Sequence, residues 1–128
     1  KGKYGLSITA DTTADKVKNE DFDAIFIPGG WAPDKMRMDK NILEIVRGTM
    51  AADRLVMVIC HGGWVLASAG VLKGRHMTCY EAIIDDVKNA GATFEDAELV
   101  EDGNLLSSRN PMDLPALMRR AVEKLSDA

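Results

Sequence analysis

The strongest constraint on the fold of this chain is a pair of short segments that are almost wholly apolar. Residues 24–27 read AIFI and residues 55–59 read LVMVI, and both segments end at turns that contain glycine. Neither segment alternates polar with apolar residues, and β-branched residues are frequent in both. This pattern is typical of strands that are buried on both faces of a parallel sheet.

Segments with helical periodicity follow these two predicted strands. Apolar residues at positions 42, 45, 46 and 50 share one helical face, and Asn41 and Glu44 are spaced as a capping box. Asn110 and Pro111 suit the start of a last helix, whose apolar stripe runs to Leu125. Two further helices are expected before Gly70 and before Gly91, and a strand–turn–strand unit over residues 97–108.

Strands that alternate with helices predict a single three-layer α/β domain over residues 1–128, with a mostly parallel sheet. Ligands of such sheets bind outside the carboxyl ends of the strands. The two apolar strands lead into residues 28–30, which read PGG, and residues 60–63, which read CHGG. We therefore expect the functional site where these two turns meet.

Composition and charge exclude several classes of protein. The chain of 128 residues carries a net charge of −4 without a stripe of Lys or Arg, so we expect no nucleic-acid partner. No apolar run reaches the roughly 18 residues that span a bilayer, and no signal peptide is recognisable, so we expect no membrane partner and a cytoplasmic location. The two cysteines, Cys60 and Cys79, offer neither a disulfide framework nor a zinc knuckle, and we expect neither a metal nor a cofactor.

Cys60 is the candidate nucleophile because it directly follows a buried strand and precedes a helix, as in a nucleophile elbow. The free N–H groups of a helix N-terminus stabilise a thiolate and can also hold the oxyanion that forms when a thiolate attacks a carbonyl. The alternative is a buried structural cysteine. Gly30 and His61 are the candidate backbone donors to that oxyanion, although a glycine pair after a strand is also an ordinary turn.

His61 is the candidate general base, since its unperturbed pKa lies near neutrality. Adjacent side chains usually point in different directions, so this role requires unusual backbone geometry. His76 suits the start of a strand instead. Asp34 stands in the first turn of a predicted helix, where an acidic residue stabilises the helix dipole without any catalytic role. Trp31 and Trp64 lie beside the two turns and are expected in a pocket wall or an interface.

The motifs together resemble the ThiJ/PfpI superfamily, and in particular its PfpI-type branch of intracellular cysteine peptidases and deglycases. The similarity covers essentially the whole chain, and its parts occur in the same order. They are residues 27–34 (IPGGWAPD), 58–62 (VICHG), 66–72 (LASAGVL), 85–87 (DDV) with 89–91 (NAG), and 102–104 (DGN) with 107–109 (SSR).

The resemblance implies a flavodoxin-like α/β/α sandwich and a homo-oligomer, from dimer to hexamer, with the active site at the interface. It implies Cys60 as nucleophile, His61 as its partner, and Asp34 of a neighbouring subunit as the carboxylate of the triad. The peptidases usually carry Glu at this last position, so Asp shortens the reach by one methylene. Tyr80 matches a position near the cleft, and Trp31 and Gly62 are further pocket candidates.

The resemblance also implies a β–α–β unit ahead of Lys1, which has no initiator Met before it. The first strand of that unit is expected in the centre of the sheet, where it ends with a Glu that contacts the nucleophilic thiol. We therefore expect this sequence to be N-terminally incomplete, with a gap in the middle of the sheet whose neighbouring strands carry unpaired backbone groups.

Three functions are compatible with the sequence. The first is a cysteine-dependent hydrolase acting on a peptide or a small carbonyl compound, that is, an intracellular peptidase, or a glyoxalase or deglycase for methylglyoxal-type adducts. The second is a non-enzymatic role in redox or stress sensing, or as a chaperone, with an oxidised Cys60. Cys79 would then be a possible resolving thiol. The third is a ligand-sensing domain of a transcription regulator, which the acidic charge disfavours.

Overall fold

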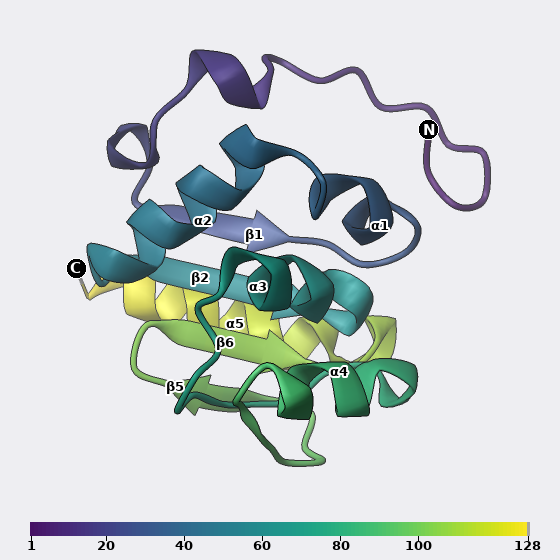
Figure 1. The fold of residues 1–128 in the computed structure, drawn as a ribbon, viewed down its shortest axis with the longest axis vertical. Coiled ribbons are helices and arrows are strands. Elements are labelled where there is room, and N and C mark those ends of the chain that lie inside the picture. The colour runs from purple at the N-terminus through teal and green to yellow at the C-terminus, as the bar shows by residue number, and fades with distance from the viewer. Residues whose placement is uncertain (128) are drawn as a thin grey trace.

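A computed structural model describes residues 1–127 and contains a main sheet of four strands in the order β1-β2-β6-β5 (Figure 1). The strands are β1 (Ala24–Ile27), β2 (Leu55–Ile59), β6 (Leu105–Ser108) and β5 (Val100–Asp102). The first three run parallel, and β5 pairs antiparallel with β6 as the two arms of the predicted strand–turn–strand. The two apolar segments are therefore neighbouring parallel strands, as predicted.

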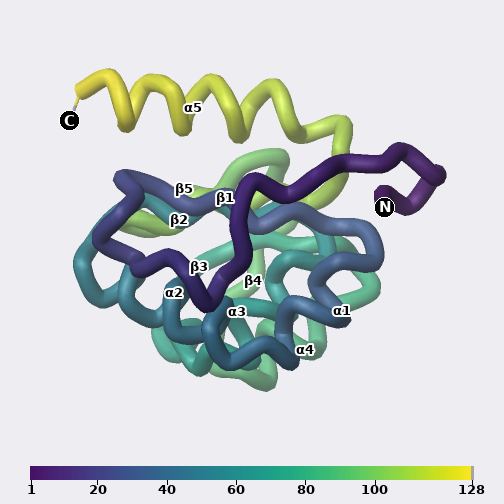
Figure 2. The backbone as a smooth tube through the Cα atoms, turned by 90° about the horizontal axis from the view of Figure 1, so that it is seen from above, coloured from purple at the N-terminus to yellow at the C-terminus, as the bar shows by residue number. Residues whose placement is uncertain are grey.

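Helices cover both faces of this sheet (Figure 2). The C-terminal helix α5 (Leu114–Ser126) lies alone on one face, while the other four α-helices pack on the opposite face. The chain thus has the predicted three-layer α/β architecture. The four helices of the second layer are α1 (Ala32–Met36), α2 (Lys40–Ala51), α3 (Gly63–Ala69) and α4 (Ile84–Asn89).

Short elements connect these layers. A second sheet of two parallel strands, β3 (His76–Met77) and β4 (Thr93–Phe94), lies beside α4. The chain also forms five single turns of 3-10 helix. These are η1 (Ala14–Lys16), η2 (Asn19–Asp21), η3 (Cys60–Gly62), η4 (Glu81–Ile83) and η5 (Pro111–Asp113).

The strand β2 contributes to two separate cores, which explains why its sequence does not alternate in polarity. Val56 and Val58 join the core beneath α2 and α3, whereas Leu55, Met57 and Ile59 face α5. All five side chains are buried. Burying an aliphatic side chain of this size contributes about 1.5–3 kcal/mol, so β2 anchors both layers and holds its own carboxyl end rigidly.

The expected gap in the middle of the sheet is wrong. Residues of β1 pair directly with β2, from Ala24 opposite Leu55 to Ile27 opposite Val58, and β2 pairs directly with β6. The crossover through α1 and α2 brings the two apolar strands side by side, so their backbone groups satisfy each other. In the described residues, the strands with an unpaired outer edge in this sheet are β1 and β5, at its two sides.

The capping box predicted from Asn41 and Glu44 is also wrong, because α2 begins earlier. Asp39 is its N-cap, and the Asp39 carboxylate accepts hydrogen bonds from the N–H groups of Asn41 and Ile42 at 2.8 and 3.2 Å. The start of the last helical segment agrees with the prediction. The Asn110 side chain accepts from the N–H of Met112, and η5 then continues into α5.

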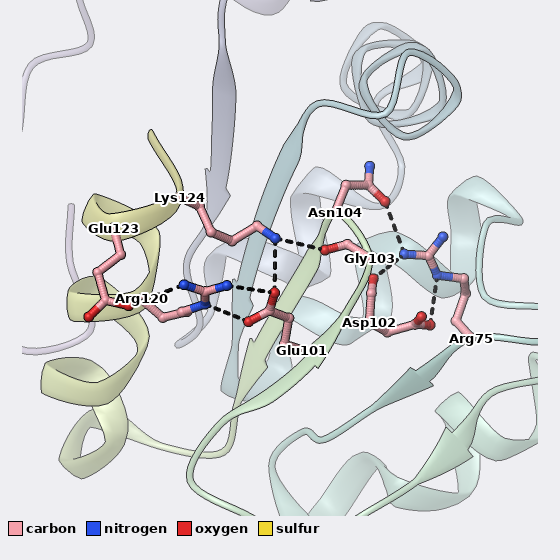
Figure 3. A network of polar contacts seen from close by, with 8 residues as sticks. All are labelled: Arg75, Glu101, Asp102, Gly103, Asn104, Arg120, Glu123 and Lys124. Carbon is pink, nitrogen blue, oxygen red and sulfur yellow. Dashed lines mark hydrogen bonds and ion pairs between the residues drawn. The ribbon is translucent and has the colours of Figure 1, made fainter. Parts of the chain in front are cut away.

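An ionic network fastens the β5–β6 hairpin at the end of the sheet that lies away from Cys60 (Figure 3). Glu101 accepts from Arg120 at 2.6 Å and from Lys124 at 2.9 Å, which ties β5 to α5. On the other side, Arg75 donates to the Asp102 carbonyl at 2.7 Å and to the Asn104 side chain at 3.0 Å. Hydrogen bonds from Arg120 and then Lys124 lower the pKa of Glu101 to about 2.

Residues 1–23 form an arm along the outside of the molecule. Its first 13 residues are exposed, while the Arg54 side chain holds its later part by donating to the carbonyl of Asn19 at 2.7 Å. From β1 the arm runs back across the α2 side and ends near α1 (Figures 1 and 2). The beginning of the chain therefore lies beside the turn that follows β1.

Candidate active site

Cys60 stands at the carboxyl end of β2 in a strained backbone conformation. Its φ of +59° lies in the left-handed region, which among the described non-glycine residues is shared with Asp53 alone. Such a conformation costs of order 1 kcal/mol and persists where the surrounding structure enforces it, often at functional sites. The turn η3 follows at once and leads into α3, so the strand, strained residue and helix form the predicted elbow.

Two glycines let the turn after β1 approach this elbow. A Cβ atom on Gly29 would lie 2.7 Å from the Cβ atom of Cys60 and 3.3 Å from its Sγ atom. A Cβ atom on Gly62 would lie 2.9 Å from the carbonyl oxygen of Ile27. Any side chain at either position would push the two turns apart. Gly62, expected as a pocket residue, is buried beneath the elbow and does not line the cavity.

His61 points the same way as Cys60 in spite of their adjacency. The Cys60 Sγ atom lies 3.3 Å from the His61 Nδ1 atom, a contact that the left-handed backbone of Cys60 permits. The imidazole stacks on the ring of Tyr80 at 4.9 Å between centroids and meets the ring of Trp64 edge-on at 5.0 Å. Tyr80 is itself held by its N–H, which donates to the Cys60 carbonyl at 3.3 Å.

The pKa of His61 is lowered from 6.5, first because burial penalises the charged imidazolium and second because the cation of Lys3 lies nearby. Both causes favour the neutral ring near neutral pH. A neutral imidazole can accept the proton of the adjacent thiol. The geometry and the electrostatics of the pair are thus both compatible with proton transfer from Cys60 to His61.

Cys60 and His61 open into a cavity of about 640 Å³. Several residues expected at the site line it, namely Gly30, Trp31, Asp34 and Tyr80, and Trp64 joins them. The sequence reasoning missed Lys3, Tyr4 and Pro111, which also line the cavity. A larger hollow of about 750 Å³ lies at the opposite end of the sheet, around Asp23, Arg54 and Asn104, and contains no cysteine or histidine.

Asp34 reaches the rim of the cavity from α1 of the same chain. Its carboxylate is 60% exposed and lies 3.7 Å from the ammonium group of Lys35. Within the described residues, His61 makes no hydrogen bond to Asp34, and its polar contact is with Cys60. A single chain therefore brings the candidate nucleophile Cys60 to the imidazole of His61 but leaves the Asp34 carboxylate apart from them.

Other residues considered from the sequence lie away from this chemistry. Cys79 is buried, and burial raises the pKa of its thiol to about 12, with further contributions from the nearby Asp86 and Cys60. His76 is exposed and pairs with Glu95 at 3.0 Å between Nε2 and Oε2.

The described residues contain no group of three His, Cys, Asp or Glu side chains that could hold a metal ion. Within the same part of the chain, no helix is long and apolar enough to cross a membrane. The cavity thus presents a thiol, an imidazole, a carboxylate and an ammonium group as its own chemistry.

Comparison with known proteins connects this arrangement to a family. Residues 1–124 match the DJ-1/PfpI family. The protein named Deglycase PfpI from Pyrococcus furiosus is 48% identical over 124 residues, which cover 97% of this chain and 75% of that protein. The protein named Putative cysteine protease YraA from Bacillus subtilis is 40% identical over 124 residues, which cover 97% of this chain and 73% of that protein.

The fold is similar to that of a solved two-domain protein from Anabaena variabilis, described as containing DJ-1/ThiJ/PfpI-like and ferritin-like domains. The TM-score is 0.93 and the sequences are 42% identical. The match covers 95% of this chain and 35% of the Anabaena chain. Sequence and fold therefore point to the same group of proteins.

Proposed function

The chain belongs to the DJ-1/PfpI family, and on that premise we propose that it is a cysteine-dependent hydrolase in which Cys60 attacks a carbonyl carbon. The observation that carries this proposal is the contact of 3.3 Å between Cys60 Sγ and His61 Nδ1, at a strained elbow that opens into a cavity. The names of the relatives, deglycase and putative cysteine protease, agree with an attack on a carbonyl group.

The first step is proton transfer from the Cys60 thiol to the neutral imidazole of His61, which leaves a thiolate. The thiolate attacks the carbonyl carbon, and the electron pair of the C=O bond moves to oxygen. The N–H groups of Gly30 and His61 are the proposed donors to that oxyanion, since both residues line the cavity. An aldehyde carbonyl gives a hemithioacetal at this point.

With an amide-type substrate, the amine leaves with the proton that His61 returns, and an acyl-enzyme remains. A water molecule, deprotonated by His61, then attacks the thioester and releases the acid and the thiol. Peptidase and deglycase activities thus share the first attack. We propose a peptide or a small carbonyl compound, including methylglyoxal-type adducts, as substrate.

We further propose that Asp34 of a neighbouring subunit completes the site in a homo-oligomer, and that residues 1–128 act as one domain. The exposed carboxylate of Asp34 supports a contact beyond its own chain. Trp31 supports an interface at this place, since it lies three residues earlier and is 72% exposed. Large exposed apolar side chains often mark such surfaces.

The proposed attack is tested by replacing each cysteine in turn. Cys60→Ser should lower turnover of methylglyoxal, or of a peptide–coumarin substrate, by at least about a thousandfold, because the weaker acid Ser is not activated by the same imidazole. Cys79→Ala is the matched control and should retain turnover within about threefold. Turnover that survives Cys60→Ser would contradict the mechanism, and the active substrate decides between the two activities.

The shared site is tested by mixing two variants, Cys60→Ser, which should be inactive, and Asp34→Asn, which should have a reduced rate. If Asp34 acts on the Cys60 of a neighbouring chain, a mixed oligomer contains a site with both native residues, so subunit exchange should restore part of the activity. Each variant incubated alone is the control. If the mixture is no more active than the variants incubated alone, Asp34 does not act on the Cys60 of a neighbouring chain.

A further inference from the structure

The arm at the beginning of the chain builds one wall of the Cys60 cavity. Lys3 and Tyr4 both line it, although they are separated from the Cys60 elbow by more than 50 residues of sequence. The Lys3 ammonium lies 5.4 Å from the ring centroid of Tyr4 and 6.0 Å from that of Trp31. These rings place a cation at the mouth of the site.

The charge of Lys3 has no local counterpart. Among residues 1–127, no carboxylate oxygen lies within 4.0 Å of the Lys3 ammonium. The one carboxylate that lines the cavity, Asp34, is instead paired with Lys35. Lys1 and Lys35 also line an adjoining hollow together with Lys3, which adds to the positive potential at this rim.

The remaining charged groups around the cavity already have partners. The guanidinium of Arg37 lies 5.3 Å from the centroid of the Trp64 ring and donates to the Ser68 hydroxyl at 2.9 Å. The carboxylate of Asp86 accepts from the Trp64 indole at 2.8 Å. Lys3 is therefore the cavity-lining cation that is free to bind a ligand.

The field of Lys3 also reaches the reacting pair, since it contributes to the lowered pKa of His61. Aromatic rings line much of the rest of the cavity, where Trp64 and Tyr80 contact the imidazole and Trp31 lies near Lys3. A ligand there would contact apolar rings along its length, the thiol at one end and a cation at the other. A single flexible ammonium suits a singly charged group better than a phosphate dianion, which is typically held by several N–H donors.

We propose that Lys3 determines substrate specificity by binding a carboxylate carried by the carbonyl compound that Cys60 attacks. The inference rests on the proposed function for the attack itself and adds the class of substrate: carbonyl compounds with an anionic carboxylate beyond an apolar body. Lys3 forms and breaks no covalent bond in this role. It orients the substrate and favours anionic over neutral compounds.

The first test does not depend on turnover. Iodoacetate and iodoacetamide both alkylate a thiolate, forming an S–C bond and releasing iodide, but one carries a carboxylate and the other a neutral amide. The rate constant for iodoacetate divided by that for iodoacetamide, both at Cys60, is measured by peptide mass spectrometry. This ratio should fall about five- to tenfold from wild type to Lys3→Met. Any change in the thiolate population affects both reagents alike and cancels in the ratio.

Two variants control this measurement. Lys3→Arg keeps the positive charge and should keep the wild-type ratio. Lys16→Met removes one charge from an exposed position on the same arm and outside the cavity, so its ratio should equal that of wild type. A ratio that is the same in wild type and Lys3→Met, or that falls equally in Lys16→Met, would overturn the proposal.

The second test uses turnover of two 2-oxoaldehydes, phenylglyoxal and 4-carboxyphenylglyoxal. Wild type should show a kcat/KM about five- to tenfold higher for the anionic compound, Lys3→Met should show a ratio near one, and Lys3→Glu should favour the neutral compound. Equal turnover of both compounds by wild type would overturn the role of Lys3 but not the proposed attack by Cys60. If neither compound is turned over, the proposed activity on 2-oxoaldehydes fails, and the alkylation ratio still decides the role of Lys3.

Discussion

The two cysteines of this chain are chemically identical, yet their surroundings differ in every property that governs reactivity. Cys60 is partly exposed, sits in a left-handed conformation and lies 3.3 Å from an imidazole nitrogen. Cys79 is 2% exposed, and burial raises its thiol pKa to about 12. Position at the end of a buried strand, rather than residue type, therefore distinguishes the proposed nucleophile from a core side chain.

Short of removing the thiol itself, the largest expected effect comes from disturbing the contact that lets the β1 turn approach Cys60. In Gly29→Ala, the new methyl group would lie 2.7 Å from the Cys60 Cβ atom, so the elbow must shift. We expect kcat/KM to fall about 10- to 100-fold, since small misplacements of a reacting group are costly. The measurement is steady-state kinetics together with thermal unfolding.

Gly74→Ala is the matched control for this substitution. Gly74 has a φ of +77° and open space around its Cβ position, so the variant carries backbone strain but no collision near the site. It should lose about 1 kcal/mol of stability and keep its kcat/KM. Equal losses of activity in both variants would show that a general loss of stability, and not the collision with Cys60, explains the effect.

A smaller effect should appear in the pH dependence of kcat/KM. Burial and Lys3 lower the pKa of His61, so the neutral imidazole persists below pH 6.5 and activity should decline only at more acidic pH. Removing the cation in Lys3→Met raises the pKa of His61 toward its ordinary value, which moves the acid limb of kcat/KM toward higher pH. A limb that stays in place or moves toward lower pH would contradict the coupling between Lys3 and His61.

The smallest effect on either thiol is expected from the ionic network at the far end of the sheet. Glu101→Gln removes the carboxylate held by Arg120 and Lys124, and we expect a loss of about 1 kcal/mol at neutral pH for this partly exposed network. The lowered pKa of Glu101 means that the network stabilises the fold above its ordinary pKa of 4.5 and that this contribution is lost as the pH falls toward 2.

Urea unfolding of wild type and Glu101→Gln at pH 7 and at pH 2.5 checks this prediction. The difference in unfolding free energy should be present at pH 7 and largely absent at pH 2.5. Alkylation rates of both cysteines in the native protein at pH 7 should remain unchanged. A change in Cys60 reactivity would mean that the two ends of the sheet are not independent.

The sequence predicted much of the architecture because its strongest signals are local. Both apolar strands begin and end where predicted, and the left-handed Gly70 ends α3 as expected for a helix C-terminus. The resemblance to the ThiJ/PfpI superfamily is confirmed by the match of residues 1–124.

Features that depend on contacts between distant segments could not be predicted from the sequence. The position of Lys3 and Tyr4 follows from the path of the arm, which has no hydrophobic periodicity to reveal it. The expectation of a central gap was wrong because the strand order depends on which crossover connects β1 to β2. The alignment of Cys60 with His61 required a backbone dihedral angle that residue types alone do not specify.

The central claim, that Cys60 is the activated thiol and Cys79 is not, is tested most directly by measuring both alkylation rates in the native protein. Iodoacetamide at pH 7, followed by peptide mass spectrometry, should modify Cys60 at least about a hundredfold faster than Cys79, because reaction requires an accessible thiolate. His61→Ala should slow the modification of Cys60 and leave Cys79 unchanged. Equal rates for the two cysteines, or a faster Cys79, would contradict the account.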